Sequence, residues 1–162
     1  MGFIVAVTGS IGAGKTTLAS RLAAEYGALH LSSDGVRESL SHKQRRSGDR
    51  VFAELHRRFE RALDERRSVV LDSTGMSPRF RALLRSRREK IVHVHLLLRS
   101  PQRFEQRERE RTDRPAGAVP AAAFHRSRSV EFHDPPDVLV ETDDLTAAEV
   151  YVLVRAALRL QA

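Results

Sequence analysis

A glycine-rich segment near the start of the chain is the feature that most constrains its fold. Residues 9–16 read Gly-Ser-Ile-Gly-Ala-Gly-Lys-Thr and match the pattern G-x-x-x-x-G-K-[ST]. An apolar, β-branched run over residues 3–8 precedes the segment, and residues 16–26 follow it with apolar side chains at helical spacing. A buried strand, a glycine turn and a helix in this order predict an α/β fold.

The same segment predicts a binding site for a nucleoside triphosphate. Glycines allow successive backbone N–H groups to turn toward one anion, and the helix N-terminus adds partial positive charge. Lys15 is expected to reach the β- and γ-phosphates, and the Thr16 hydroxyl is expected to bind Mg²⁺. We therefore assign ATP, or another NTP, to the following residues: Gly9, Ser10, Ile11, Gly12, Ala13, Gly14, Lys15, Thr16 and Thr17.

The rest of the chain continues the alternation of strands and helices. Short apolar runs predict further strands at residues 28–31, 68–71, 91–98 and 138–140. Helical spacing predicts helices that begin near residue 36, over 51–65, 79–88, 102–111 and 146–160, and after Pro120. We expect a parallel sheet of about five strands flanked by helices. A chain of 162 residues is expected to form this as one domain, residues 1–162.

Composition excludes several kinds of chemistry. The chain contains no cysteine, so it has no disulfide, thiolate zinc site or thiol nucleophile. The apolar run near the N-terminus is too short for a signal peptide or a membrane span, and we expect a cytoplasmic protein. The net charge of +7 predicts attraction to polyanions or phosphorylated ligands, although an arginine-rich solvated surface is the alternative.

Two charged residues follow the second predicted strand. Because the carboxyl ends of parallel strands form the ligand-binding edge of such a sheet, we expect Asp34 to face the γ-phosphate. Asp34 could then accept a proton from an acceptor hydroxyl as a general base. Arg37 lies one helical turn later and could hold a phosphate on the acceptor. The alternative is that Asp34 only caps a helix and Arg37 is solvated.

A third carboxylate, Asp72, ends the predicted strand over residues 68–71. This is the position from which a carboxylate binds Mg²⁺ or its waters in phosphate-loop enzymes, so Asp72 joins Thr16 as a candidate metal ligand. A cap at the end of the strand is the alternative. Ser73 and Thr74 follow and could contact the acceptor.

Arginines near residue 110 predict a mobile lid over approximately residues 102–130. Phosphoryl transfer needs cations around the equatorial oxygens and exclusion of water. Arg107 and Arg111 are four residues apart and share a helix face, with Glu108 and Glu110 on other faces. The alternative is a solvated, charged helix. Arg109 and Arg114 belong to the same basic segment.

Signals for other classes of nucleotide-binding protein are missing. The chain has no N-K-x-D segment to recognise guanine, and its size leaves no room for the additional elements of oligomeric ATPases. A phosphotransferase is therefore favoured.

Four segments taken together resemble a known family. The segments GSIGAGKTT, SSDGVR, VVLDSTGMSP and RERERTDRPAGAVP are similar, in order, to the polynucleotide 5′-hydroxyl kinase branch of the phosphate-loop kinases, within the AAA-type and zeta-toxin-like superfamily. The resemblance implies Lys15, Asp34, Arg37 and Arg111 as catalytic residues, with Arg37 on the phosphate 3′ of the reacting nucleotide. It implies Arg111 as the lid cation, with Arg107 supporting the lid through an ion pair and both arginines near the nucleotide. The third segment departs from the family, which often has Asp-Ala-Thr-Asn where this chain has Asp72-Ser73-Thr74-Gly75.

The resemblance implies an ATP-dependent kinase that phosphorylates the 5′-hydroxyl end of RNA or DNA. The basic run of Arg79, Arg81, Arg85, Arg87 and Arg88, with Arg45, Arg46 and Arg50, could guide a nucleic-acid backbone. Two alternatives stay open. One is a kinase for a small-molecule hydroxyl (nucleotide, sugar or antibiotic), because the D-x-x-R segment also resembles adenylylsulfate kinases. The other is a non-catalytic NTP-binding module.

The histidines give weak signals. His93 and His95 alternate on a predicted strand and share one face, but no third metal ligand is expected nearby. We assign both of them, and His30 beside the second strand, to packing.

Overall fold

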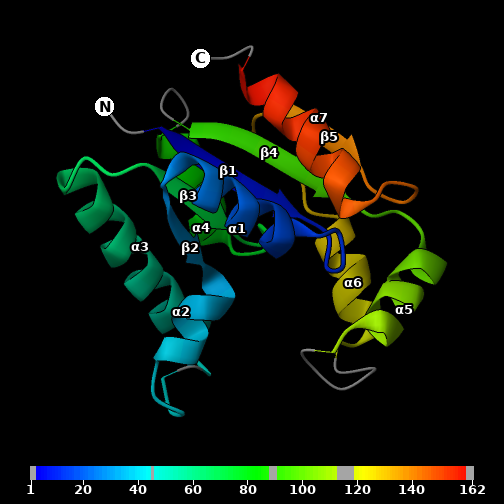
Figure 1. Ribbon diagram of the computed structural model, residues 1–162. Coiled ribbons are helices and arrows are strands. Elements are labelled where there is room, and N and C mark those ends of the chain that lie inside the picture. The colour runs from blue at the N-terminus through cyan, green and yellow to red at the C-terminus, as the bar shows by residue number, and fades with distance from the viewer. Residues whose placement is uncertain (1–2, 45, 88–90, 113–118, 160–162) are drawn as a thin grey trace.

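In the computed structural model, which describes residues 3–44, 46–87, 91–112 and 119–159, five parallel strands form one sheet flanked by helices (Figure 1). The strands are β1 (Ile4–Gly9), β2 (Leu29–Ser32), β3 (Val69–Asp72), β4 (Ile91–Leu97) and β5 (Val138–Glu141). The helices are α1 (Lys15–Tyr26), α2 (Ser33–Ser39), α3 (Gly48–Asp64), α4 (Pro78–Ser86), α5 (Pro101–Glu110), α6 (Ala121–Arg128) and α7 (Ala147–Arg159). This architecture confirms the predicted fold class.

The order of strands places β1 at the centre of the sheet. The order is β2-β3-β1-β4-β5, so β1 pairs with β3 on one side and with β4 on the other. The register aligns Val7 of β1 with Asp72 of β3, and Ser32 of β2 with the same Asp72. Because every pairing is parallel, the ends of β1, β2 and β3 lie at one edge of the sheet.

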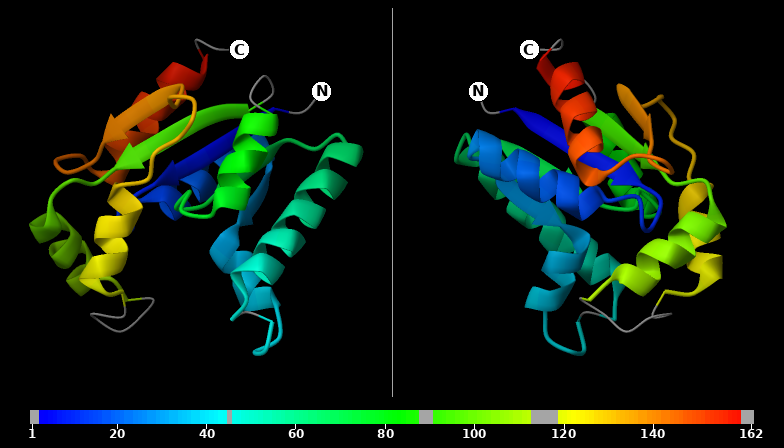
Figure 2. Two further views of the ribbon diagram at one scale, coloured as in Figure 1. Left: turned by 180° about the vertical axis from the view of Figure 1, so that it is seen from behind. Right: turned by 45° about the vertical axis from the view of Figure 1, so that its right-hand side comes forward.

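Helices cover both faces of this sheet (Figure 2), and an apolar core lies between the sheet and the helices on each face. Side chains alternate between the faces along a strand, so Val5 of β1 packs with α1 and α7, whereas Ile4 packs with α3 and α4. The largest fully buried side chains include Phe59 of α3 and Phe80 of α4. Burial of each such side chain stabilises the fold by about 1.5–3 kcal/mol. The sheet is thereby fixed, and its carboxyl edge is a rigid base for a site.

Serine caps move two helices earlier in the chain than the sequence pattern predicts. The Ser32 hydroxyl accepts a hydrogen bond from the Gly35 N–H, so α2 begins at Ser33 and not near residue 36. In the same way the Ser47 hydroxyl accepts from the N–H of Arg50, and α3 begins three residues before the predicted start. Residues 33–35, expected in a loop, are therefore the first turn of α2.

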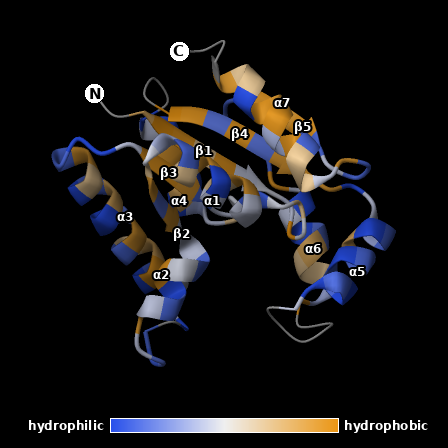
Figure 3. Cartoon of the chain, in the orientation of Figure 1, coloured by the Kyte–Doolittle hydropathy of each residue, from blue (hydrophilic) through white to orange (hydrophobic). Residues whose placement is uncertain are grey.

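Helices α5 and α6 lie beyond the carboxyl ends of the strands and form a separate wall (Figure 1). Figure 3 shows α5 as almost entirely hydrophilic, in contrast to β1. The two helices are joined by Phe104 and Phe124, whose stacked rings have centroids 4.4 Å apart. The predicted lid therefore has two helices, and its residues 113–118, including Arg114, lie outside the described residues. None of the helices within the described ranges is long and apolar enough to cross a membrane.

Candidate active site

The glycine-rich loop, residues 10–14, joins β1 to α1 at the carboxyl edge of the sheet. Gly12 and Gly14 have φ angles of +81° and +89°, a left-handed conformation that favours glycine. Gly12 also packs closely on α5, because a Cβ there would lie 3.2 Å from the Phe104 ring, which would have to shift slightly. The glycines thus serve the turn itself and the close approach of α5.

Contacts from β4 and α6 hold this loop in place. The Leu98 N–H donates to the Ser10 hydroxyl at 3.1 Å, and the Ile11 N–H donates to the Ser127 hydroxyl at 2.9 Å. Ser10 and Ser127 are both fully buried. A network of satisfied, buried hydrogen bonds keeps the loop backbone in one conformation.

Lys15 and Thr16 stand at the start of α1, as the sequence predicts. The Lys15 ammonium donates to the backbone carbonyl of Ser10 at 2.8 Å, so the side chain lies against the loop. The Thr16 hydroxyl donates to the Asp72 carboxylate at 2.7 Å. The structure therefore brings together the two residues that the sequence analysis assigns to a metal.

The donor set at Thr16 and Asp72 fits Mg²⁺. This ion is usually bound through one or two protein oxygens, with phosphate oxygens and waters completing an octahedron. Asp72 is only 4% exposed, and its carboxylate also lies 3.6 Å from His30 Nε2. No cluster of three or more His, Cys, Asp or Glu side chains able to hold a metal occurs among the described residues. A metal here would accordingly need phosphate oxygens to complete its shell.

A hollow of about 500 Å³ lies over the loop, and we call it the loop hollow. The loop and α1 contribute one side, and the end of α5 contributes the other, with these residues: Gly12, Gly14, Lys15, Thr16, Thr17, Arg107, Glu110, Arg111 and Thr112. The structure therefore places both predicted lid arginines at the same cavity as the predicted phosphate-binding residues.

Arg107 has a different role from the one implied by the resemblance. Its guanidinium donates to the carbonyl of Gly12 at 3.0 Å, and to the side-chain and backbone oxygens of Thr142. No carboxylate within the described ranges forms an ion pair with it, so the expected ion pair is wrong. Burial lowers the pKa of Arg107 from its ordinary value, yet an arginine stays charged. Arg107 is thus a fixed clamp between the loop and the segment after β5.

Arg111 follows the last turn of α5 and lies beside a buried carboxylate. Its guanidinium is 3.8 Å from Glu108, which is only 6% exposed. The sequence analysis placed Glu108 on another helix face, and this is wrong, because residues three apart are neighbours on a helix surface as well as residues four apart. Arg109, in contrast, is exposed and lies 3.9 Å from Glu105.

A second hollow of about 300 Å³ adjoins the loop on the other side of Arg107, between β5 and α7. Its wall is largely apolar and includes Ala13, Leu18, Leu145 and Val150. An apolar slot beside a phosphate-binding loop is suited to a nucleotide base. Sequence reasoning assigned Ala13 to the nucleotide but missed Leu18, Leu145 and Val150. The polar turn at residues 141–146, which follows the last strand at the ligand-binding edge, was the available signal.

A third hollow, of about 590 Å³, lies between α3 and α4, and we call it the α3–α4 hollow. Arg37, Ser73 and Thr74 line it together, and their contacts with an acceptor stay a prediction. Its remaining lining is mostly apolar and was not predicted, with Phe52, Leu55, Met76 and Phe80 among its members. The hollow therefore combines an apolar wall with one arginine, several hydroxyls and the carboxylate of Asp49, which lies 3.5 Å from Arg79.

Asp34 is exposed and lies in the first turn of α2. It does not cap its own helix, because Ser32 does. Asp34 is not among the residues that line the α3–α4 hollow, whereas Arg37 on the same helix is. Since β2 is two strands from β1, the start of α2 is roughly 10 Å from the end of β1. The role of Asp34 as a base stays a prediction.

Two histidines are buried under the end of β1. His93 Nε2 and His95 Nδ1 each lie 2.8 Å from the Thr8 hydroxyl, and the Phe132 ring covers both imidazoles. Burial, with a smaller contribution from the charge of Lys15, lowers the pKa of His95 to about 4. His95 is therefore neutral at pH 7 and supports the strand end next to the loop.

This burial gives a testable pH dependence. The ordinary pKa is 6.5, so between pH 6.5 and about 4 the unfolded chain binds a proton at His95 that the folded chain does not. Stability must then fall as the pH drops through this range, by about 2–3 kcal/mol in total. Urea denaturation from pH 7 to pH 4 should show this loss relative to His95→Gln, which keeps a polar group near Thr8. If the free energy of unfolding fell equally with pH in both proteins, His95 would not be the group responsible.

Several arginines expected to guide a nucleic acid have partners within the chain. Arg79 lies 3.5 Å from Asp49, and Arg87 donates to Glu60 at 3.1 Å. Arg81 donates to the backbone carbonyls of Gly75 and Met76 at 2.8 Å. Arg45 and Arg88 lie outside the described residues. The basic run is thus partly structural.

Fold and site together define a phosphate-loop protein with kinase architecture. A sugar kinase from Janibacter sp. HTCC2649 has a similar structure, with a TM-score of 0.74, 17% identity, and coverage of 98% of this chain and 95% of the other. A gluconokinase from Sinorhizobium meliloti 1021 gives 0.66 at 21% identity, covering 99% and 95%. The APS kinase of Mycobacterium tuberculosis, in complex with AMPPNP and APS, gives 0.64 at 23% identity and covers 98% of both chains.

At the level of sequence, a family described as the AAA domain matches residues 4–133. Because the match extends over most of the chain, this protein belongs to that family. No curated protein sequence matches it.

Proposed function

We propose that this protein is an ATP-dependent kinase that transfers the γ-phosphoryl group to a hydroxyl of a small, negatively charged molecule. One observation carries the proposal. Asp72, which accepts the Thr16 hydrogen bond, is followed directly by Ser73 and Thr74 in the wall of the α3–α4 hollow. A triphosphate on the loop and an acceptor in this hollow would meet at the end of β3.

The size and lining of the α3–α4 hollow favour a small acceptor over a nucleic-acid end. Its volume of about 590 Å³ falls within the usual range for small-molecule sites, and such sites are mostly apolar with a few polar groups. Arg37 is the cation that would bind an anionic group on the acceptor. The similar structures belong to kinases whose names specify sugar, gluconate and APS. The net charge of +7 favours the nucleic-acid end, which we keep as the second candidate.

The residues supply the parts of an in-line phosphoryl transfer. Loop N–H groups and Lys15 would hold the β- and γ-phosphates, and Thr16 with Asp72 would hold Mg²⁺. When bound, Mg²⁺ neutralises charge on the phosphate oxygens. A bond forms between the acceptor oxygen and the γ-phosphorus while the bond from that phosphorus to the β–γ bridging oxygen breaks, and ADP leaves. Asp34 would take the proton of the acceptor hydroxyl, and Arg111 would balance charge on the transferring group.

A panel of acceptors tests the proposal. The protein would be incubated with γ-labelled ATP, Mg²⁺ and one acceptor at a time: sugars, sugar acids, adenylylsulfate and a 5′-hydroxyl oligonucleotide. We expect label on an anionic small molecule, with a KM that depends weakly on salt. Label on the oligonucleotide alone, with affinity that falls steeply as salt rises, would instead establish the nucleic-acid candidate. Nucleotide binding without label on any acceptor would support a non-catalytic module.

A substitution at Arg37 tests the anionic group of the acceptor. Arg37→Ala should raise KM for the accepted anionic compound about tenfold or more, the usual cost of one charge-assisted contact. Its kcat and the affinity for ATP should change little. Arg67→Ala removes the same charge from an exposed position before β3 and serves as the control. If both substitutions changed the KM for the acceptor equally, Arg37 would not be part of the acceptor site.

Arg111→Ala is expected to act on turnover. Because Arg111 lines the loop hollow and not the α3–α4 hollow, we expect kcat to fall by about 10²-fold or more, while the KM for the acceptor stays within a few-fold. Steady-state kinetics with both substrates varied would measure this. Arg109→Ala, on an exposed arginine of the same helix, is the matched control. A defect confined to the acceptor KM would show that Arg111 belongs to the acceptor side.

A further inference from the structure

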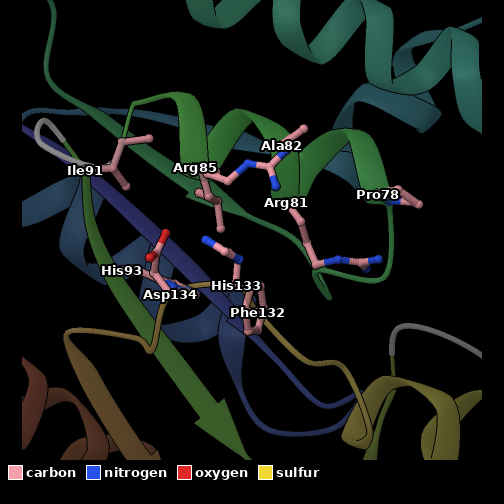
Figure 4. A pocket seen from close by; sticks show the side chains of 10 residues that line it. Pro78, Arg81, Ala82, Arg85, Ile91, His93, Phe132, His133 and Asp134 are labelled. Atoms are coloured by element: carbon pink, nitrogen blue, oxygen red, sulfur yellow. The ribbon is translucent and has the colours of Figure 1, made fainter.

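A separate hollow of about 280 Å³ lies on the opposite side of α4 from the α3–α4 hollow (Figure 4). Its walls are α4, the beginning of β4 and the segment between α6 and β5, and we call it the α4–β4 hollow. Phe80 of α4 and Ser77, which caps this helix, line the α3–α4 hollow, whereas Arg81 and Arg85 of α4 line this one. The two hollows share no lining residue among those described. Nothing in the phosphoryl transfer uses the α4–β4 hollow.

The polar part of this hollow is mostly made of cationic and donor groups, beside an apolar part that includes Leu84, Ile91 and Phe132. Arg81, Arg85 and His133 line it, and Asp134 is its single carboxylate. Figure 4 shows Arg85 on α4 and His133 and Asp134 on the facing segment reaching toward a common space. Within the described part of the chain, Arg85 and His133 form no hydrogen bond or ion pair. The Arg81 guanidinium donates to the backbone carbonyls of Gly75 and Met76, and no carboxylate among the described residues forms an ion pair with Arg81 or Arg85. An anion in the hollow would therefore be attracted by two positive charges that only Asp134 of the lining opposes.

We propose that the α4–β4 hollow is a binding site for a compact, multiply charged anion, a phosphate group in particular. Phosphate oxygens match the planar donor array of arginine, and a doubly charged group balances Arg81 and Arg85 in the presence of Asp134. The volume is slightly below the usual range for small-molecule sites, which suits a phosphate with a small substituent and not a nucleotide.

Binding at this site would reach the α3–α4 hollow through Arg81. The Arg81 guanidinium donates to the carbonyls of Gly75 and Met76, in the segment that follows β3. Phe132, also in the wall of the α4–β4 hollow, packs on the same segment, because a Cβ added at Gly75 would lie 2.8 Å from its ring. Thr74 and Met76 of this segment line the α3–α4 hollow. A bound anion would therefore lie beside Arg81 and Phe132, the two side chains that hold the segment 74–76 in the wall of the α3–α4 hollow.

The test is a titration of the ¹⁵N-labelled protein with sodium phosphate at constant ionic strength. Saturating AMPPNP and Mg²⁺ would occupy the glycine-rich loop, which would otherwise bind phosphate as well. We expect saturable changes in the amide signals of Arg85 and His133, and in those of residues 74–76. A parallel titration with glycerol phosphate separates the two sources of the group, since the tighter ligand identifies free phosphate or a phosphate ester.

Matched variants decide whether this hollow is the site. Arg85→Ala and His133→Ala replace side chains of exposed residues, so both proteins should fold, and each should weaken phosphate binding about tenfold or more. Arg87→Ala, which removes an arginine paired with Glu60 just after the same helix, should bind phosphate within twofold of the unmodified protein. The proposal is overturned if no saturable shift occurs at Arg85, or if Arg85→Ala binds phosphate as before. No step uses catalysis, so failure here is distinct from failure of the kinase proposal.

Discussion

Asp34→Ala is expected to lower kcat by about 10²- to 10⁴-fold while the affinity for ATP stays unchanged. Loss of a general base removes the acceptor of the hydroxyl proton, and this range is the usual cost. The nucleotide should still bind, because its contacts come from the loop and α1 and not from α2. Single-turnover transfer from γ-labelled ATP measures the first effect, and calorimetry with AMPPNP measures the second.

Glu38→Ala provides the control for Asp34. Glu38 is also exposed, lies four residues later on α2 and has the same charge. The control should keep transfer within a few-fold. Asp34→Asn should be as inactive as the alanine variant, because an amide has a similar shape but does not accept the proton. Transfer at the unmodified rate in Asp34→Ala would reject Asp34 as the base and leave nucleotide binding as the better supported function.

Gly9→Ala is expected to destabilise the fold by at least about 3 kcal/mol. Gly9 has a φ of +146°, and an added Cβ would lie 1.9 Å from the carbonyl oxygen of Leu96 on β4. Neither atom can move alone, because the Ser10 N–H donates to that same oxygen at 3.1 Å. Backbone strain and overpacking each cost about 1–3 kcal/mol.

Thermal unfolding measures this effect. For a domain of this size, a loss of 3 kcal/mol corresponds to a Tm lower by roughly 10 °C. Gly48→Ala is the control, because a Cβ at the first residue of α3 meets no atom within 4 Å, and its Tm should stay the same or rise slightly. A Tm for Gly9→Ala within 2 °C of the unmodified protein would show that β1 and β4 separate at little cost.

Local patterns predicted the fold and the centre of the site. The strand, loop and helix around Lys15 follow from short-range chemistry, and so does the placement of Asp72 at the same edge as Thr16. This prediction succeeded because the carboxyl ends of parallel strands lie at one edge of the sheet. Residues at the strand ends can therefore be placed near one another even when side-chain packing is unknown. Helix starts were less accurate at residues 33 and 48, where a serine cap outweighed the apolar periodicity.

Contacts between distant elements could not be predicted in this way. The apolar slot around Leu18 and Val150 exists only because α1 and α7 pack on the same face of the sheet. Burial of Glu108 depends on how α5 packs against other parts of the fold, which helical spacing does not describe. The ion pair expected for Arg107 was wrong for a related reason. Backbone carbonyls of residues 12 and 142 lie within its reach, and the sequence carries no signal for them.

The clamp formed by Arg107 limits which part of α5 can move when a substrate binds. Since its guanidinium is tied to Gly12 and Thr142, the seven residues from Pro101 to Arg107 are anchored to the sheet edge. Residues 108–110 and Arg111, which follows the helix, form none of these bonds, so a movement there would leave the clamp intact. A closing step built this way is short and orders few residues, so it consumes little conformational entropy. Arg111 would then move toward the substrate while Arg107 keeps the rest of α5 in place.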